Sequence, residues 1–185
     1  MTTVRIDGWT DGDLRLLRDL NTPEAKRHLG GPEPDEKVLD RHRRYLTSEG
    51  FGTGRMYRIL LDGVDRSVGT VGFYERVWQG AEVYEIGWGV LPAYQGRGIA
   101  VAATRLAVEA AREAGARRYL HAFPSVDNAA SNAVARKAGF ERVGECDVEF
   151  PPGQWMRSND WRLDLFRHWD ASRSGPSGGV SRAGS

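Results

Sequence analysis

A strand that leads through a glycine-rich turn into a helix is the feature that most constrains this chain. Residues 83 to 90 alternate as a half-buried strand does, with Tyr84, Ile86, Trp88 and Val90 on one face. Residues 99 to 114 are rich in alanine and leucine, which favours a helix. We expect the intervening Gly96-Arg97-Gly98 to form the helix's first turn, where backbone N–H groups are free and glycine lets a phosphate approach. Because Arg97 can add a charge-assisted contact, the sequence predicts a pyrophosphate site.

Two common nucleotide-binding motifs do not fit this turn. A P-loop needs a lysine followed by serine or threonine at the start of the helix, and no lysine stands there. A dinucleotide fingerprint needs a third glycine, where this chain has Val101. It also needs an acidic residue farther along, where residues 117 to 119 are Arg, Arg and Tyr. The pyrophosphate is therefore not expected to belong to either class of nucleotide.

A third kind of phosphate-binding loop does fit. The residues from Gln95 to Ala100 follow the pattern Gln/Arg-x-x-Gly-x-Gly/Ala. This pattern resembles the coenzyme A pyrophosphate loop of the GCN5-related N-acetyltransferases (GNAT). The order of strands and helices from residue 82 to residue 149 is also similar to that of this family.

A second motif supports the same resemblance. Asn128-x-x-Ser131 is followed by Lys137-x-Gly139-Phe140, which is similar to the family's next helix. Within the family, the Asn-x-x-Ser form resembles the branch that includes ribosomal-protein N-terminal acetyltransferases. The resemblance therefore implies acetyl-CoA as co-substrate and a direct transfer of the acetyl group to an amine, with no covalent enzyme intermediate.

The same resemblance implies the fold and the donor site. The fold class is α/β (mixed α+β), the acyl-CoA N-acyltransferase fold, a twisted mixed sheet of about six to seven strands with helices on both faces. The strand end before Pro92 offers a backbone edge that the amides of pantetheine can pair with. The residues expected to bind acetyl-CoA are Trp88, Gly89, Val90, Gln95, Gly96, Arg97, Gly98, Ile99, Ala100, Val101, Asn128 and Ser131.

The chain has the length of one domain. We assign residues 1–170 to it and expect residues 171–185, which are serine, glycine, proline and arginine with little to bury, to be a disordered tail. Thr10 or Asp11 can cap a first helix. The further elements expected are a short turn from 23 to 29, a helix at 34–46, and strands at 55–61, 67–77, 118–123, 141–150 and 161–166.

Composition excludes several function classes. Basic and acidic residues nearly cancel, at 26 against 25, so we expect no nucleic acid partner. The single cysteine, Cys146, excludes an internal disulfide framework. The four histidines are scattered without ligand spacing, so no metal is expected. Without a signal peptide or a long apolar run, the expectation is a cytoplasmic protein with no membrane contact.

The acceptor amine must lose a proton before it attacks. Freeing a lysine amine at pH 7 requires about 4 to 5 kcal/mol, against about 1 kcal/mol for an α-amino group. A weak carboxylate base therefore suffices for an α-amine. The candidates are Glu85, which shares a strand face with Gly87 and Gly89, and Glu149, which precedes the loop at 151–153. Both stay open at this stage.

The leaving thiolate needs a proton or a donor. Many relatives have a tyrosine where this chain has Ala135, so Ser131 or water is the remaining donor, although Ser131 can equally serve the helix start. His121 is either a base or a half-buried structural residue. Trp155 and Glu149 are the candidates for binding the acceptor, and Trp155 is expected in a loop at residues 154–159.

Three functions remain open. The first is acetylation of the N-terminal α-amine of a protein or peptide, and the second is acetylation of a small amine such as an amino sugar, a polyamine or an amino acid. The third is a non-catalytic sensor of coenzyme A, a function with which the alanine at position 135 is compatible. Exposed strand edges are compatible with a monomer or a homodimer.

Overall fold

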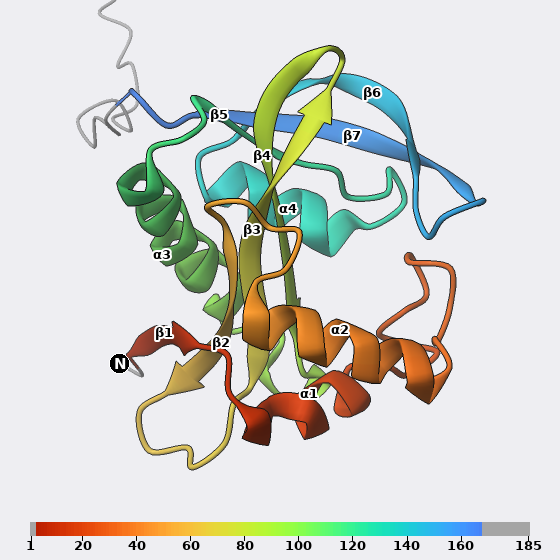
Figure 1. Cartoon of the computed structure of the whole chain (residues 1–185), viewed down its shortest axis with the longest axis vertical. Helices are drawn as coiled ribbons and strands as arrows, with labels where there is room; N and C mark the ends of the chain where they lie inside the picture. Colours follow the sequence, from red (N-terminus) through yellow and green to blue (C-terminus); the bar gives the residue numbers. More distant parts are fainter. Residues whose placement is uncertain (1–2, 168–185) are drawn as a thin grey trace, which may run out of the picture.

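The computed structural model describes residues 3–167. Within them, seven strands form one mixed sheet in the order β1-β2-β3-β4-β5-β7-β6 (Figure 1). The strands are β1 (Val4–Gly8), β2 (Arg55–Leu61), β3 (Gly69–Trp78), β4 (Ala81–Val90), β5 (Tyr119–Ala122), β6 (Glu141–Glu149) and β7 (Trp155–Asp164). The helices are α1 (Leu14–Asp19), α2 (Asp35–Thr47), α3 (Ile99–Ala114) and α4 (Ala129–Lys137), with short 3₁₀ turns at Asp11–Asp13 and Pro92–Tyr94.

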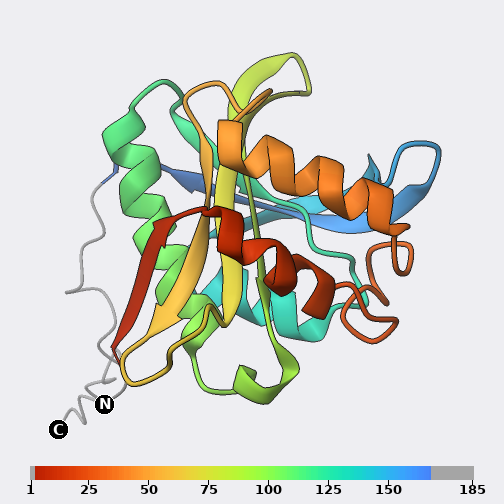
Figure 2. The same cartoon turned by 60° about the horizontal axis from the view of Figure 1, so that its bottom comes forward.

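Helices cover both faces of this sheet, as the sequence predicts. Figures 1 and 2 show α1 and α2 together on one face and α3 and α4 on the other. The face under α1 and α2 is called the acceptor face below, because it carries Glu85. The opposite face carries the main core.

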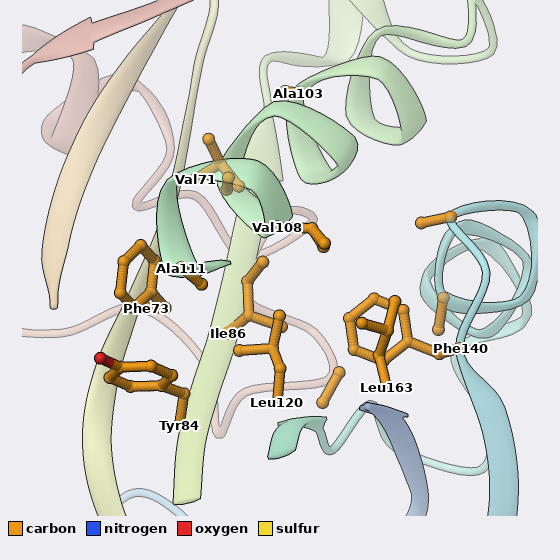
Figure 3. Packing of buried hydrophobic residues seen from close by; sticks show 14 of the residues in the cluster. Val71, Phe73, Tyr84, Ile86, Ala103, Val108, Ala111, Leu120, Phe140 and Leu163 are labelled. Carbon is orange, nitrogen blue, oxygen red and sulfur yellow. The ribbon is translucent and has the colours of Figure 1, made fainter. Parts of the chain in front are cut away.

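The core is built from strand residues that pack against the alanine-rich side of α3 (Figure 3). Ala103, Ala107 and Ala111 of this helix have no exposed surface, so the helix backbone lies close to the sheet. The predicted inward face of β4 is confirmed, since Tyr84 and Ile86 are buried there. Such burial of apolar area is the main stabilising term of the fold. The strand residues of this cluster include Val71, Phe73, Leu120 and Leu163.

The sheet opens between β4 and β5, its one parallel pair. Only two rungs join these strands, Tyr84 with Leu120 and Glu85 with His121. Beyond them, residues 86–90 of β4 pair with β3 alone. The far half of β4 therefore has an open backbone edge, as expected for the strand that ends at Pro92.

Two strands differ from the sequence prediction, one because it was not predicted and one because it begins earlier. The sequence indicated no strand at Val4–Gly8, which pairs with β2 at the edge of the sheet. Strand β7 begins at Trp155 instead of residue 161, so most of the predicted loop at 154–159 is strand. Its first half lacks apolar alternation because the buried positions there are polar, namely Ser158, Asn159 and Asp160.

The remaining predictions agree closely or lie outside the described residues. The helices expected at 34–46 and 99–114 are α2 and α3, and residues 23–29 form turns. The predicted tail at 171–185 lies outside the described residues, as do residues 168–170 of the predicted domain. No helix within residues 3–167 combines the length and apolar character that crossing a membrane requires.

Arginine provides the cation in almost all of the ion pairs. Within residues 3–167, the pairs whose cation is not arginine are Lys26–Glu33 and His121–Asp160. Exposed pairs of this kind contribute only about 0–1 kcal/mol each. The two exceptions are both largely buried, and both lie on elements that border the acceptor face.

Candidate active site

The entry to α3 forms an open cradle of backbone N–H groups. Gly96 and Gly98 adopt left-handed conformations, with φ of 71° and 76°, and a Cβ at either position would meet nothing within 4 Å. The helix begins at Ile99, so the prediction that residues 96–98 form its first turn is wrong by one turn. Because two left-handed residues cannot continue a right-handed helix, they form the loop that precedes it. No side chain of residues 3–167 caps this helix.

The side chains of this loop differ in their orientation. Gln95 donates from Nε2 to the carbonyl of Val90 at 3.0 Å, so it ties the loop to the end of β4. Arg97 is exposed and lies 5.8 Å from the ring centroid of Tyr94. The cradle therefore consists of the N–H groups of Ile99, Ala100 and Val101 with one exposed cation beside them.

The open edge of β4 lies next to this cradle. Gly87 is exposed in the middle of a central strand, and a Cβ there would meet nothing within 4 Å. A Cβ at Gly89 would lie 3.7 Å from Oγ1 of Thr70 and 3.8 Å from Leu20, which is ordinary contact. Glycine therefore leaves room for a ligand chain over Gly87, while Trp88 packs against the core on the other face.

The start of α4 borders the same opening. Asn128 is the N-cap residue, and its Oδ1 accepts the backbone N–H of Ser131 at 3.1 Å. No hydrogen bond among residues 3–167 engages the hydroxyl of Ser131, which leaves it free as a donor. Ala135 lies in the core with no exposed surface.

Asn132 organises this region, and sequence reasoning missed it. Its Nδ2 donates to the carbonyls of Ser125 at 2.9 Å and Asn128 at 2.8 Å. Its Oδ1 accepts from Nδ2 of Asn159 and from Nε1 of Trp161, both at 2.8 Å. One amide thus joins α4 to β7 and to the segment after β5. The Asn-x-x-Ser motif indicated Asn128 and Ser131 instead, because Asn132 is not one of its defining positions.

Glu85 lies on the acceptor face within a group of polar side chains. Its carboxylate forms an ion pair with Arg76 of β3. Tyr74 is its cross-strand partner, and burial together with the neighbouring Glu85 charge raises the pKa of this phenol. The phenol therefore stays protonated, and the carboxylate has a donor and a cation beside it.

Glu149 and Trp155 lie elsewhere. They face each other across the β6–β7 pair, on the side of that pair opposite to Ser158 and Asp160. Glu149 accepts the backbone N–H of Gly153 at 2.7 Å within the hairpin, and Trp155 is 71% exposed. The structure therefore does not bring this pair together with Glu85, because their register places them on the other face.

His121 and Asp160 form a buried pair beside Glu85. Nδ1 of His121 lies 2.7 Å from Oδ1 of Asp160, and the side chains are 7% and 6% exposed. Trp78 donates from Nε1 to Oδ2 of the same carboxylate at 3.1 Å. The ring of Phe123 stacks on the imidazole at 5.7 Å. Sequence spacing cannot reveal this pair, because the partners stand far apart in the chain.

The loop between α1 and α2 meets the β6–β7 turn at one side of the site (Figure 1). Gly30 has a φ of 83°, and a Cβ there would lie 2.8 Å from Cδ of Pro151 and 3.0 Å from Oε1 of Gln154. Only glycine permits this close approach. The two loops therefore form a narrow border beside the acceptor face.

Lys26 anchors the same loop through buried charges. Its amine lies 3.8 Å from Glu33, which also pairs with Arg41. Burial, with the neighbouring charge of Arg41, lowers the pKa of Lys26 to about 8. Its charge is therefore harder to keep in the folded protein than in the unfolded chain, where the lysine pKa is about 10.4.

We expect Lys26→Met to stabilise the protein at pH 7 by about 1–2 kcal/mol, a gain that shrinks as pH rises. Between about pH 8 and pH 10.4 the unfolded chain retains a proton that the folded protein has released, so the wild type gains stability with rising pH. Urea unfolding at pH 7 and pH 10 measures the difference. The exposed Lys37→Met on α2 is the control, and an equal gain at both pH values would contradict the expectation.

No group of three or more histidine, cysteine, aspartate or glutamate side chains within residues 3–167 is arranged to hold a metal ion. The half-buried thiol of Cys146 borders Asp160, and burial raises the pKa of this thiol to about 11. It is therefore a neutral neighbour of the site and a poor nucleophile.

Comparison with known proteins agrees with this geometry. A family model described as an acetyltransferase (GNAT) domain matches residues 3–141. No curated protein matches the chain. A GNAT-family acetyltransferase from Bacillus anthracis superposes with a TM-score of 0.71 at 17% identity, covering 88% of this chain and 95% of its own.

Two further solved structures have known acceptors. An acetyltransferase from Salmonella typhimurium that modifies the N-terminal serine of ribosomal protein L7/L12 has a TM-score of 0.70 at 20% identity, over 88% of this chain and 95% of that one. Aminoglycoside acetyltransferase AAC(6')-Ib, solved with coenzyme A, has a TM-score of 0.69 at 20% identity, over 89% and 95%. Since the family model spans most of the chain, and the open sheet with its N–H cradle accords with it, this protein belongs to the GNAT family of acetyltransferases.

Proposed function

We propose that this protein transfers the acetyl group of acetyl-CoA directly to the N-terminal α-amine of a protein or peptide. The observation that carries the proposal is the open edge of β4 at Gly87, which lies between the N–H cradle of α3 and the carboxylate of Glu85. Donor and acceptor can then meet at one strand. The reaction needs no covalent intermediate on the protein.

The residues around the opening fit coenzyme A. The pyrophosphate would be held by the N–H groups at the start of α3, with Gln95 fixing the loop and Arg97 adding a positive charge. The amides of the pantetheine arm would pair with the edge from Trp88 to Val90, as an added strand does. Asn128 would border the arm from α4.

The chemistry then depends on the acceptor amine. Acetyl-CoA supplies its acetyl group as a thioester, whose carbon–sulfur bond breaks as the amine nitrogen bonds to the carbonyl carbon. A backbone N–H of the β4 edge would stabilise the negative charge that develops on the carbonyl oxygen. Glu85 would attract the ammonium form of the acceptor and favour loss of its proton through an intervening water. Ser131 or water would return a proton to the thiolate.

Three observations favour an α-amine as the acceptor. Deprotonation at pH 7 requires about 1 kcal/mol for an α-amine and about 4 to 5 kcal/mol for a lysine, so only the former suits a half-buried carboxylate. The close contact of Gly30 with Pro151 and Gln154 borders the acceptor face, which suits a slender chain end. The Salmonella relative that modifies an N-terminal serine is a precedent within the same fold.

The test compares four amines with the same enzyme preparation. These are a short peptide with a free N-terminal serine, its Nα-acetylated form with a free lysine, spermidine, and an aminoglycoside. Release of free thiol from acetyl-CoA measures the rate. We expect the serine peptide to be acetylated fastest. Faster reaction of spermidine or the aminoglycoside would favour the small-molecule function, and acetyl-CoA binding without any turnover would favour a sensor.

Replacing the carboxylate on the acceptor face tests its role. We expect Glu85→Gln to lower kcat/KM for the serine peptide by roughly 10- to 50-fold, because the amide neither attracts the ammonium group nor assists its deprotonation. Glu82→Gln, on the same strand but exposed and paired with Arg117, is the matched control. The same assay on Glu149→Gln compares the two carboxylates, and a larger loss there than in Glu85→Gln would reverse the assignment.

A further inference from the structure

The buried pair His121–Asp160 has a defined pattern of protons. Trp78 is always a donor, so Oδ2 of Asp160 accepts its N–H at 3.1 Å. The other oxygen, Oδ1, lies 2.7 Å from Nδ1 of His121. An ionised carboxylate only accepts, so the hydrogen of this contact belongs to Nδ1. The imidazole then carries its lone pair on Nε2.

The position of this lone pair is set by the sheet. Strand β5 lies between β7 and β4, so an imidazole that turns Nδ1 towards β7 turns Nε2 away from it. His121 and Glu85 form the last rung before β4 and β5 separate. Paired residues point to the same face, so both side chains lie on the acceptor face. No hydrogen bond within residues 3–167 engages Nε2.

Charged groups of both signs face the imidazole from the neighbouring strands. Arg76 carries one positive charge, and Glu85 and Asp160 carry two negative charges. Arg162, the cross-strand partner of His121 in β7, adds a second positive charge on the same face. Tyr74 from β3 and Cys146 from β6, whose pKa values are raised by burial, are neutral at pH 7. The two carboxylates therefore flank the imidazole, Glu85 from β4 and Asp160 from β7.

Glu85 is less suited to keep the proton. Its carboxylate is already paired with Arg76, whose guanidinium also lies 5.2 Å from the ring of Trp78 and 5.1 Å from that of Phe123. In a short peptide the pKa is about 6.5 for an imidazole and about 4.3 for a glutamate carboxyl. The equilibrium constant for proton transfer from an amine is therefore on the order of a hundredfold larger with imidazole as the acceptor than with a carboxylate. Glu85 can still attract the ammonium group.

We propose that Nε2 of His121 is the base that accepts the proton of the acceptor amine, and that Asp160 is the positioning residue that holds the imidazole. The ammonium group loses one proton to Nε2, directly or through one water, which forms an imidazolium and a free amine. The imidazolium returns this proton to solvent after transfer. The proposal rests on the proposed acetyl transfer, and it adds the group that takes the proton.

Nitrogen NMR of the imidazole tests the proposal without any acceptor. On uniformly ¹⁵N-labelled protein at pH 8, we expect the His121 spectrum of a neutral ring with hydrogen on Nδ1 and a lone pair on Nε2. Asp160→Asn should shift the hydrogen to Nε2, because the amide can donate to Nδ1. A wild-type ring that carries hydrogen on Nε2, or that stays an imidazolium from pH 6 to pH 9, would overturn the proposal.

Kinetics with the serine peptide separates a base from a structural residue. His121→Asn keeps an N–H donor for Asp160 but removes the titrating ring, so kcat should fall about 100-fold with little change in KM. In wild type we expect kcat/KM to rise with pH as the imidazole loses its proton, and this rise should be absent in His121→Asn. His42→Asn is the matched control, since His42 is also buried and accepts from Trp9 at 3.0 Å.

The outcomes distinguish the two proposals. A loss of activity within threefold, with an unchanged pH profile, would make His121 structural while acetyl transfer stands. Circular dichroism and acetyl-CoA titration check that His121→Asn still folds and binds the donor. If wild type acetylates none of the four amines, the acceptor proposal fails, and the assignment of the base is then decided by the nitrogen spectrum alone.

Discussion

Gly98→Trp is expected to abolish acetyl-CoA binding, with an affinity loss of about 1000-fold, or roughly 4 kcal/mol. A Cβ at Gly98 projects into open space at the start of α3, so the indole would occupy the place where phosphate oxygens approach the N–H groups. Isothermal titration of acetyl-CoA against wild type and variant measures the effect. Free coenzyme A should lose affinity equally, and ATP should bind neither protein.

The control for this variant is Gly115→Trp. Gly115 caps the other end of α3 with a φ of 65°, close to the 76° of Gly98, so both substitutions strain the backbone to the same degree. The affinity of Gly115→Trp for acetyl-CoA should match that of wild type. If both variants lost acetyl-CoA binding alike, the loss would come from distortion of the helix. If Gly98→Trp still bound acetyl-CoA, the assignment of the phosphate site to the start of α3 would be wrong.

Asn132→Ala is expected to reduce the free energy of unfolding by about 3 kcal/mol, which corresponds to a fall in Tm of roughly 6–12 °C. The substitution removes four hydrogen bonds at once. It also leaves Nε1 of the buried Trp161 without an acceptor, which adds a desolvation penalty. Differential scanning calorimetry measures the change.

Asn128→Ala is the comparison for that experiment. It removes a single cap from the same helix, so its expected loss is only about 1 kcal/mol. A greater loss for Asn128→Ala than for Asn132→Ala would show that helix capping, and not the link between α4 and β7, holds this side of the opening. The two variants together therefore measure how much the amide of Asn132 contributes.

The donor side of the site could be predicted from the sequence because it depends on local backbone. The strand that ends at Pro92, the glycines at 96 and 98 and the helix from 99 to 114 lie within one stretch of chain. Their conformations follow from φ preferences and hydrophobic periodicity, which need no distant partner. The one error concerns a helix boundary: α3 begins at Ile99, and residues 96–98 form the loop before it.

The acceptor side could be predicted only in part because it depends on register. Alternation placed Glu85 on the face of Gly87, which needs one strand alone. The partners Arg76 and Tyr74 follow from the β3–β4 register, and His121 meets Asp160 only when β5 pairs with β7. A loop predicted at residues 154–159 assigned Trp155 to neither face of the sheet, whereas strand β7 places it on the face opposite to the acceptor face. The short β1 was missed since its five residues carry little pattern.

The preference for arginine in the ion pairs has a chemical consequence. Spontaneous or catalysed acetylation by a thioester needs a neutral amine, and a guanidinium stays charged and offers none. Of the 26 basic residues only Lys26, Lys37 and Lys137 are lysines, and the single lysine in an ion pair within residues 3–167, Lys26, has a side chain only 12% exposed. The contacts that hold this fold are thus made from groups that its own acyl donor does not modify.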